Sequence, residues 1–193
     1  MRFRVLRSSI LVSVLLALGG VVCAQTPDLS DFRNNLAPYV NSPEQAVDKM
    51  LELAKLKPGE TLYDLGCGDG RILIAAAEKY KVRAVGIEIS EHLARTAAEN
   101  VKRAGLQNEV KVIHGDFMRT NLSDANVVTL YLATTANDRL RPKLEQYLHP
   151  KTRVVSYDYP IPGWKPIDTS ETEGHHGATH TIYLYEVPNS IQK

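Results

Sequence analysis

Residues 61–71 read TLYDLGCGDGR, and this stretch decides the fold of the chain. A short apolar run that carries Asp64 ends in a turn with Gly66, Gly68 and Gly70, and a helical pattern follows directly. Glycine tolerates positive φ angles and has no Cβ, so this backbone can turn tightly and lie against a small ligand. The unpaired N–H groups at the start of the next helix face the same place. The stretch therefore predicts a strand, a ligand-binding turn and a helix.

The spacing of these glycines differs from the dinucleotide-binding fingerprint G-x-G-x-x-G. Here the order is G-x-G-x-G, and Arg71 stands where the last glycine of that fingerprint would fall. On the glycines alone, a tight turn that binds no ligand is an alternative. The choice between the two depends on residues further along the chain.

Apolar runs typical of buried strands alternate with helical patterns along the rest of the chain. This alternation predicts an α/β fold: a Rossmann-like, doubly wound sheet with helices on both faces. We expect a mostly parallel sheet of seven strands with an antiparallel C-terminal strand. Strands are expected at residues 61–65, 82–87, 110–114, 125–132, 152–157, 163–167 and 179–186, and helices at 43–54, 72–80, 90–103 and 138–148.

Two serines are expected to cap helices. Ser42 is followed by Pro43 and Gln45, which suits an N-cap, a first helical position and a capping box. Ser90 is likewise expected to be the N-cap at the start of the helix 90–103. Residues 42–188 are expected to form one domain, which residues 25–41, a polar segment with two prolines, would link to the N-terminal segment.

Three acidic residues, Asp64, Glu88 and Asp116, fall at or near the carboxyl ends of three successive expected strands. Right-handed crossovers place these ends along one edge of the sheet, where ligands of such folds bind. Glu88 has the position of a carboxylate that accepts from both hydroxyls of a ribose. Asp116 is placed to accept from an exocyclic amine, and Phe117 to pack on a purine. Each acid alone also fits a helix cap or a surface group, but their coincidence favours a nucleotide-like ligand.

Composition and charge exclude several classes of function. With 193 residues, of which 23% are charged and 44% hydrophobic, the chain suits one globular domain. Its formal net charge of +1 gives no general reason to expect nucleic acid as a partner. Cys23 and Cys67 form no C-x-x-C pair, so neither a disulfide framework nor a metal site is expected. The cluster of His175, His176 and His180 is interpreted as a solvated loop or a gate rather than as metal ligands.

Residues 1–24 differ in kind from the rest of the chain. Three arginines precede the uncharged, mostly apolar run 10–22, and Ala24 ends a group of small residues. This is the three-part form of a secretory signal peptide, and it predicts an exported protein, periplasmic or secreted. The alternative is an uncleaved membrane anchor through residues 10–22, which would be the only membrane contact.

Several strings resemble the motifs of class I S-adenosylmethionine-dependent methyltransferases. YDLGCGDGR resembles motif I of that family, VGIEIS the acidic motif that follows it, and HGDF the adenine-binding motif. APYVNSPEQAVDKMLELA, VVTLYLATTANDRLRPKL and TRVVSYDYPIPGW resemble, more narrowly, the bacterial relatives of the ATP synthase c-subunit lysine methyltransferases. The likeness extends over roughly residues 38–188.

The resemblance implies S-adenosylmethionine as the cofactor and methyl transfer by in-line displacement to a protein lysine. There are two alternatives to this function: methyl transfer to a small molecule, and an exported module that binds the cofactor without catalysis. Asp64 and Asp69 then either accept from the amino group of the methionyl part or hold the glycine turn in shape, and Tyr39 closes over the cofactor. The implied pocket consists of Tyr39, Asp64, Gly66, Cys67, Gly68, Asp69, Gly70, Glu88, Ile89, Asp116 and Phe117.

The acceptor side is expected after the fourth strand. Tyr131 ends that strand near the presumed methyl group, so we expect it to position the acceptor; a packing tyrosine is the alternative. Tyr157, Asp158 and Tyr159 are further lining candidates. The Asn/Asp-Pro-Pro-Tyr signature of the base- and glutamine-methylating branches does not follow this strand, which argues against a nucleic acid acceptor. Cys67 is interpreted as a lining residue and not as a nucleophile, because no His and Asn partners are visible.

Overall fold

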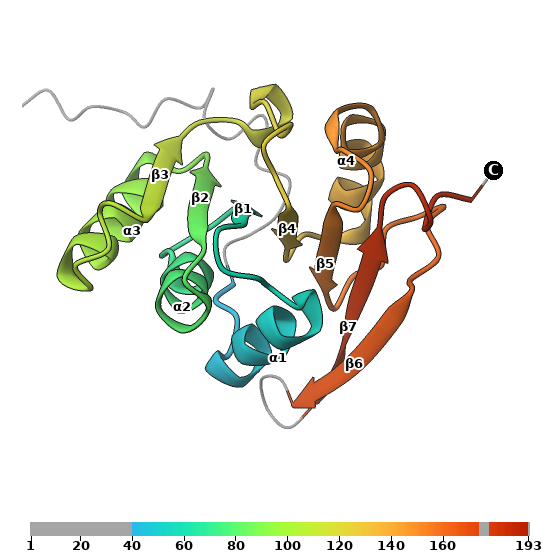
Figure 1. Cartoon of the computed structure of the whole chain (residues 1–193), viewed down its shortest axis with the longest axis horizontal. Coiled ribbons are helices and arrows are strands. Elements are labelled where there is room, and N and C mark those ends of the chain that lie inside the picture. The colour runs from blue at the N-terminus through green and yellow to red at the C-terminus, as the bar shows by residue number, and fades with distance from the viewer. Residues whose placement is uncertain (1–39, 174–177, 193) are drawn as a thin grey trace, which may run out of the picture.

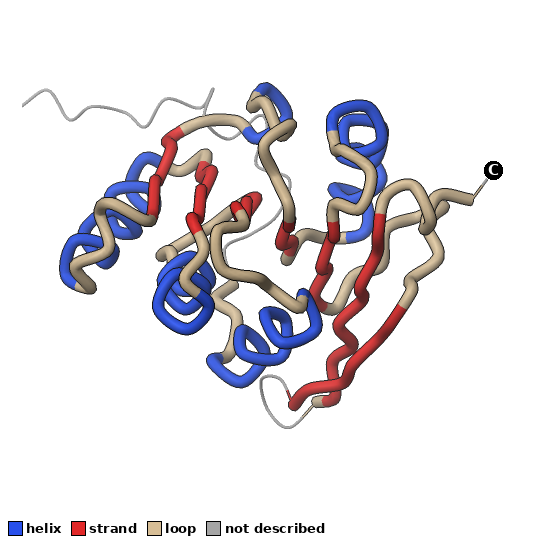
Figure 2. The backbone as a smooth tube through the Cα atoms, viewed as in Figure 1, coloured by secondary structure: helices blue, strands red, loops and turns tan. Residues whose placement is uncertain are grey.

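The computed structural model describes residues 40–173 and 178–192, which contain seven strands and four α-helices (Figures 1 and 2). The strands are β1 (Thr61–Leu65), β2 (Arg83–Glu88), β3 (Val110–His114), β4 (Val127–Leu130), β5 (Arg153–Tyr157), β6 (Asp168–Glu173) and β7 (Thr179–Glu186). The helices are α1 (Glu44–Ala54), α2 (Arg71–Tyr80), α3 (Glu91–Arg103) and α4 (Thr134–Tyr147). All seven strands join one sheet in the order β3-β2-β1-β4-β5-β7-β6.

The sheet is mixed, as predicted. Strands β1 to β5 pair in parallel, and β7 runs antiparallel between β5 and β6. The register places Leu65 beside Ile87 of β2 and beside Leu130 of β4. The strands β1 to β5 therefore end together, at what we call the carboxyl edge. This edge brings together segments as far apart in the sequence as Leu65 and Tyr157.

Helices cover both faces of the sheet, which confirms the expected layers. Helices α1, α2 and α3 lie on one face, and α4 lies on the other (Figure 1). Helix α2 buries its apolar stripe because its apolar residues recur at helical spacing. The first helix, α1, buries Ala46, Val47, Met50, Leu51 and Ala54, and the last helix, α4, buries Ala136, Asn137, Leu140 and Leu144.

One expected strand is wrong. Residues 163–167 form a loop, in which Gly163 has φ 75° and Trp164 makes only an isolated bridge to Ile191. Pro162 and Pro166 lack the N–H group that a strand ladder requires, which disfavours a strand there. The sixth strand is instead β6, whose sequence DTSETE is polar because the strand lies at the edge of the sheet and is mostly exposed.

The helix starts were predicted less well than the strands. Ser90 caps α3 as expected, with its Oγ accepting from the N–H of Leu93 at 3.4 Å. Ser42 does not cap α1, since Pro43 occupies the N-cap position and no side chain caps that end. Helix α4 begins at Thr134, four residues before the expected start at 138. The sequence did not indicate this first turn, because Thr and Asn are weak helix formers. No helix in residues 40–173 or 178–192 is long and apolar enough to cross a membrane, and residues 1–24 lie outside these ranges.

Candidate cofactor and acceptor site

The glycine turn after β1 has the backbone that only glycine adopts readily. Gly66, Gly68 and Gly70 have φ angles of 85°, 53° and 83°. A Cβ on Gly70 would lie 3.2 Å from the Cβ of Ala97 on α3, so the turn also packs closely against a helix. The result is a stretch of bare backbone at the carboxyl edge, which confirms the expected strand, turn and helix.

Glu88 ties the end of β2 to this turn. Its side chain is buried; Oε2 accepts from the N–H of Gly68 and Oε1 from the N–H of Ser90, both at 2.9 Å. Each carboxylate oxygen has a second lone pair, so these bonds leave the acceptor capacity that two ribose hydroxyls would need. The structure thus places Glu88 beside the turn, and its contact with a ribose stays a prediction.

Asp64 is buried between β1 and β4. It is 3% exposed, and its Oδ1 accepts from the Thr129 hydroxyl at 2.8 Å. Burial raises the pKa of Asp64 to about 7, and the negative charges of Glu88 and Asp69 act in the same direction. Sequence reasoning missed Thr129, because nothing local links two residues on different strands.

Asp69 holds the turn in shape, which was the second of its two expected roles. It accepts from Arg71 Nε at 3.0 Å and from Arg71 Nη2 at 2.6 Å, and its backbone carbonyl accepts from Asn100 Nδ2 at 2.8 Å. Arg71 also donates from Nη1 to the carbonyl of Ser42 at 2.7 Å. The turn is therefore hydrogen-bonded to α3 and to the segment that leads into α1.

The remaining residues of the expected pocket lie at the ends of β2 and β3. The N–H of Gly115 donates to the carbonyl of Glu88 at 2.9 Å, so these two strand ends lie side by side. Asp116 caps a short 3-10 helix, accepting from the N–H of Met118 at 2.8 Å, and Phe117 is buried. The carbonyl of Ile89 lies 3.1 Å from His114 Nε2. The contacts of Ile89, Asp116 and Phe117 with a cofactor stay predictions, and Tyr39 lies outside the described residues.

Cys67 is a packing residue in this structure. Its side chain is buried, and a Cβ on Gly86 would lie 2.6 Å from its Sγ, so the two residues fit tightly against each other. Burial raises the pKa of the Cys67 thiol, with a further contribution from the charge of Asp64. The thiol therefore stays protonated at neutral pH, in agreement with the view that it is no nucleophile.

Tyr131 lies at the same edge, one residue beyond the end of β4, and belongs to an aromatic cluster. Its ring centroid is 4.6 Å from that of Tyr157 and 6.3 Å from that of Tyr159, and Tyr157 lies 5.5 Å from the ring of His180. Burial raises the pKa of Tyr131, and the charge of Asp158 adds to this. Because Leu65 and Leu130 are paired, Gly66 and Tyr131 leave the sheet as neighbours, with the cluster next to the glycine turn.

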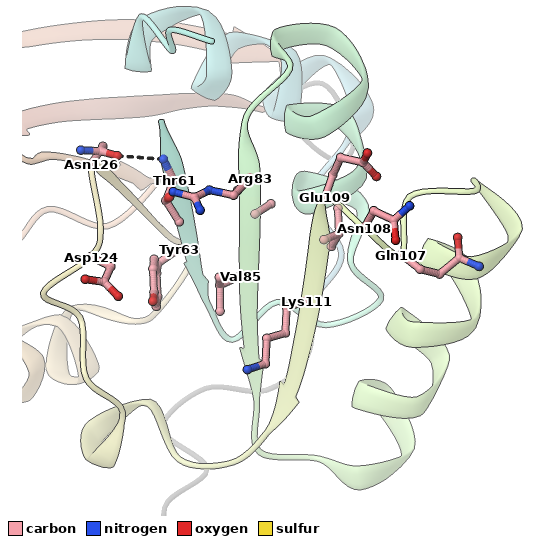
Figure 3. A pocket seen from close by; sticks show the side chains of 12 residues that line it. Thr61, Tyr63, Arg83, Val85, Gln107, Asn108, Glu109, Lys111, Asp124 and Asn126 are labelled. Atoms are coloured by element: carbon pink, nitrogen blue, oxygen red, sulfur yellow. Dashed lines mark hydrogen bonds between the residues drawn. The ribbon is translucent and has the colours of Figure 1, made fainter. Parts of the chain in front are cut away.

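A hollow of about 620 Å³ lies at the opposite ends of β1, β2 and β3 (Figure 3). Tyr63 and Val85 form part of its floor, and charged groups of both signs, such as Lys111 and Asp124, surround it. It is therefore distinct from the expected cofactor site. Among residues 40–173 and 178–192 no group of His, Cys, Asp and Glu could hold a metal ion; His175 and His176 lie outside these ranges.

Comparison with known proteins identifies the family of this chain. Residues 64–168 match the family described as the ANTKMT methyltransferase domain. The chain belongs to this methyltransferase family. The match covers more than half of the chain, including the glycine turn, Glu88 and Tyr131. The methyltransferase is also similar to the "Protein-lysine N-methyltransferase" of Saccharolobus islandicus, at 44% identity over 78% of this chain and 93% of that protein.

Two further relatives extend the comparison. The Homo sapiens protein named as the lysine N-methyltransferase of the ATP synthase c-subunit is 29% identical over 89% of this methyltransferase and 70% of that protein. A crystal structure described as an RNA methyltransferase from Salinibacter ruber in complex with S-adenosyl-L-homocysteine is 43% identical. It covers 80% of this chain and 97% of that chain, with a TM-score of 0.75. The protein is thus an S-adenosylmethionine-dependent methyltransferase with the predicted fold, and the binding of the cofactor at the glycine turn beside Glu88 stays a prediction.

Proposed function

We propose that this protein transfers methyl groups from S-adenosylmethionine to lysine side chains of a protein. One observation carries the proposal: the tyrosine cluster lies next to the glycine turn, where an amine would meet the methyl group. Aromatic rings hold ammonium groups by their π-faces and keep water away. The likeness to proteins named lysine N-methyltransferases supports the same acceptor.

The chain's own residues supply positioning. When bound, S-adenosylmethionine supplies a methyl group on a cationic sulfur, which an amine attacks directly without a metal or a covalent enzyme intermediate. The glycine turn and Glu88 would hold the donor, and Tyr131 would hold the acceptor in line with it at about 3–3.5 Å. A lysine amine must be neutral to attack, and the largely apolar aromatic surroundings favour the neutral form.

RNA is the second candidate acceptor, because the Salinibacter ruber protein is described as an RNA methyltransferase. The charge of this chain argues against it. The formal net charge is +1, and the hollow of Figure 3 mixes Arg83 and Lys111 with Glu109 and Asp124, whereas an RNA-binding surface needs a continuous basic patch. We therefore favour protein over RNA.

Transfer of labelled methyl groups tests the acceptor directly. The protein is incubated with radiolabelled S-adenosylmethionine and bacterial lysate or membrane fractions, and the products are separated by mass. We expect a labelled protein band that releases methylated lysine on acid hydrolysis. Label that disappears on ribonuclease treatment would favour RNA, and label found only in low-mass material would favour a small-molecule acceptor.

The place of this activity is a separate proposal, which rests on the N-terminal sequence alone. We propose that residues 1–24 direct export, either as a cleaved signal peptide or as an anchor through residues 10–22. Three arginines before an apolar run of this length support it.

A further inference from the structure

We propose that the hydroxyl of Tyr157 receives the ε-amino group of the acceptor lysine, within the cluster of Tyr131, Tyr157 and Tyr159. This inference rests on the proposed lysine acceptor and names the group of the chain that contacts it. The three tyrosines lie where β4 and β5 end, beside the glycine turn.

The hydroxyl of Tyr157 is unusual because it is buried without a hydrogen-bond partner among residues 40–173 and 178–192. The residue is 0% exposed, and burial raises the pKa of Tyr157 to about 12. Buried polar groups are nearly always paired, because an unpaired one has lost its water without compensation. By contrast, the buried Tyr185 of the same sheet uses its hydroxyl to accept from the N–H of Ile161 at 3.1 Å. Tyr157 thus has a free donor and acceptor at the site.

Exposure within the cluster falls from the outside inward. Tyr159 is 37% exposed, Tyr131 is half-buried and Tyr157 is fully buried. The ring contacts from Tyr159 to Tyr131 and from Tyr131 to Tyr157 therefore connect the exposed edge of the cluster with the buried hydroxyl. A lysine side chain is thin and apolar up to its terminal nitrogen, so it suits a place between aromatic rings with one polar group at the end.

The charge of Asp158 favours a cation beside the tyrosine cluster. Asp158 lies between Tyr157 and Tyr159 in the sequence, and its charge contributes to the raised pKa values of both Tyr131 and Tyr157. Its Oδ1 lies 2.9 Å from His180 Nδ1, without the alignment of an N–H hydrogen bond. Asp158 is held there by a backbone with φ 67° and by its N–H, which donates to the carbonyl of Thr181 at 2.7 Å.

The test is the substitution Tyr157→Phe, with Tyr183→Phe as the matched control on the opposite face of the same sheet. Methyl-lysine formation is measured on bacterial membrane proteins at limiting acceptor, where the initial rate follows kcat/KM, and then at rising acceptor concentrations. We expect Tyr157→Phe to lower kcat/KM for the acceptor about ten- to a hundredfold, mainly by raising KM, and Tyr183→Phe to leave it unchanged. The affinity for S-adenosylhomocysteine, measured by calorimetry, should stay that of the wild type.

Thermal unfolding gives a readout that does not depend on activity. Since the Tyr157 hydroxyl has no partner in the described ranges, its removal should leave the melting temperature equal or raise it. Wild-type methyl-lysine formation together with an unimpaired Tyr157→Phe variant would overturn the inference and leave the proposed function standing. A wild-type protein that binds the cofactor product but forms no methyl-lysine would instead overturn the proposed function, and the inference with it.

Discussion

The substitution Glu88→Gln tests the link between the turn and the second strand most directly. In the structure both oxygens of this buried carboxylate accept from backbone N–H groups, those of Gly68 and Ser90. Glutamine keeps one acceptor oxygen and turns an NH₂ group toward the other N–H, so one buried donor loses its partner. A hydrogen bond to a charged group contributes about 1.5–3 kcal/mol, and an unsatisfied buried donor costs about 1–3 kcal/mol. We expect the free energy of unfolding to fall by about 2–4 kcal/mol.

Urea denaturation measures this loss, and calorimetry measures the accompanying rise in the dissociation constant for S-adenosylmethionine. Glu91→Gln is the matched control, because Glu91 begins α3 three residues later, is 64% exposed and pairs with Arg95 on the surface. Its substitution should cost less than about 1 kcal/mol and leave cofactor binding intact. Equal losses of stability in the two variants would refute the view that Glu88 holds the turn.

Three other measurements test the glycine turn, the buried acid and the N-terminal segment. Gly70→Ala forces an L-residue to φ 83° and brings its Cβ to 3.2 Å from that of Ala97. We expect the free energy of unfolding in urea to fall by at least about 1–2 kcal/mol, with weaker cofactor binding. Wild-type stability would show that the turn can relax. The pKa of Asp64 is raised from 3.8 to about 7, so the folded state binds this proton more tightly than the unfolded state. The group therefore lowers stability as the pH rises from about 4 to 7, on the order of a few kcal/mol. Asp64→Asn should remove that decline, and an unchanged pH dependence of stability would contradict the assignment. Expression of the full chain in a bacterium should yield, by intact mass, a protein that begins after Ala24, whereas a full-length mass in the membrane fraction would favour the anchor.

Local sequence determined the elements that carry the cofactor side. The run 61–65 and the run 110–114 are strands with the expected bounds, because their apolar and β-branched residues suit a strand. The glycine turn was also predictable, since glycines at three alternate positions favour positive φ angles and a tight turn. Glu88 could be placed beside the turn because parallel strands end at one edge.

Tertiary structure alone decided the rest. The strand at 168–173 is polar and mostly exposed, and it is a strand because β7 offers it a ladder of hydrogen bonds, which no local pattern predicts. The pairing of Asp64 with Thr129 and the approach of His180 to Asp158 join residues that are 65 and 22 positions apart. The hydroxyl of Tyr157, which has no hydrogen-bond partner in residues 40–173 and 178–192, is recognised only once burial is known. Burial and contact across strands depend on how the whole chain folds back on itself, so a sequence can name the residue types at a site before it can say which of them meet.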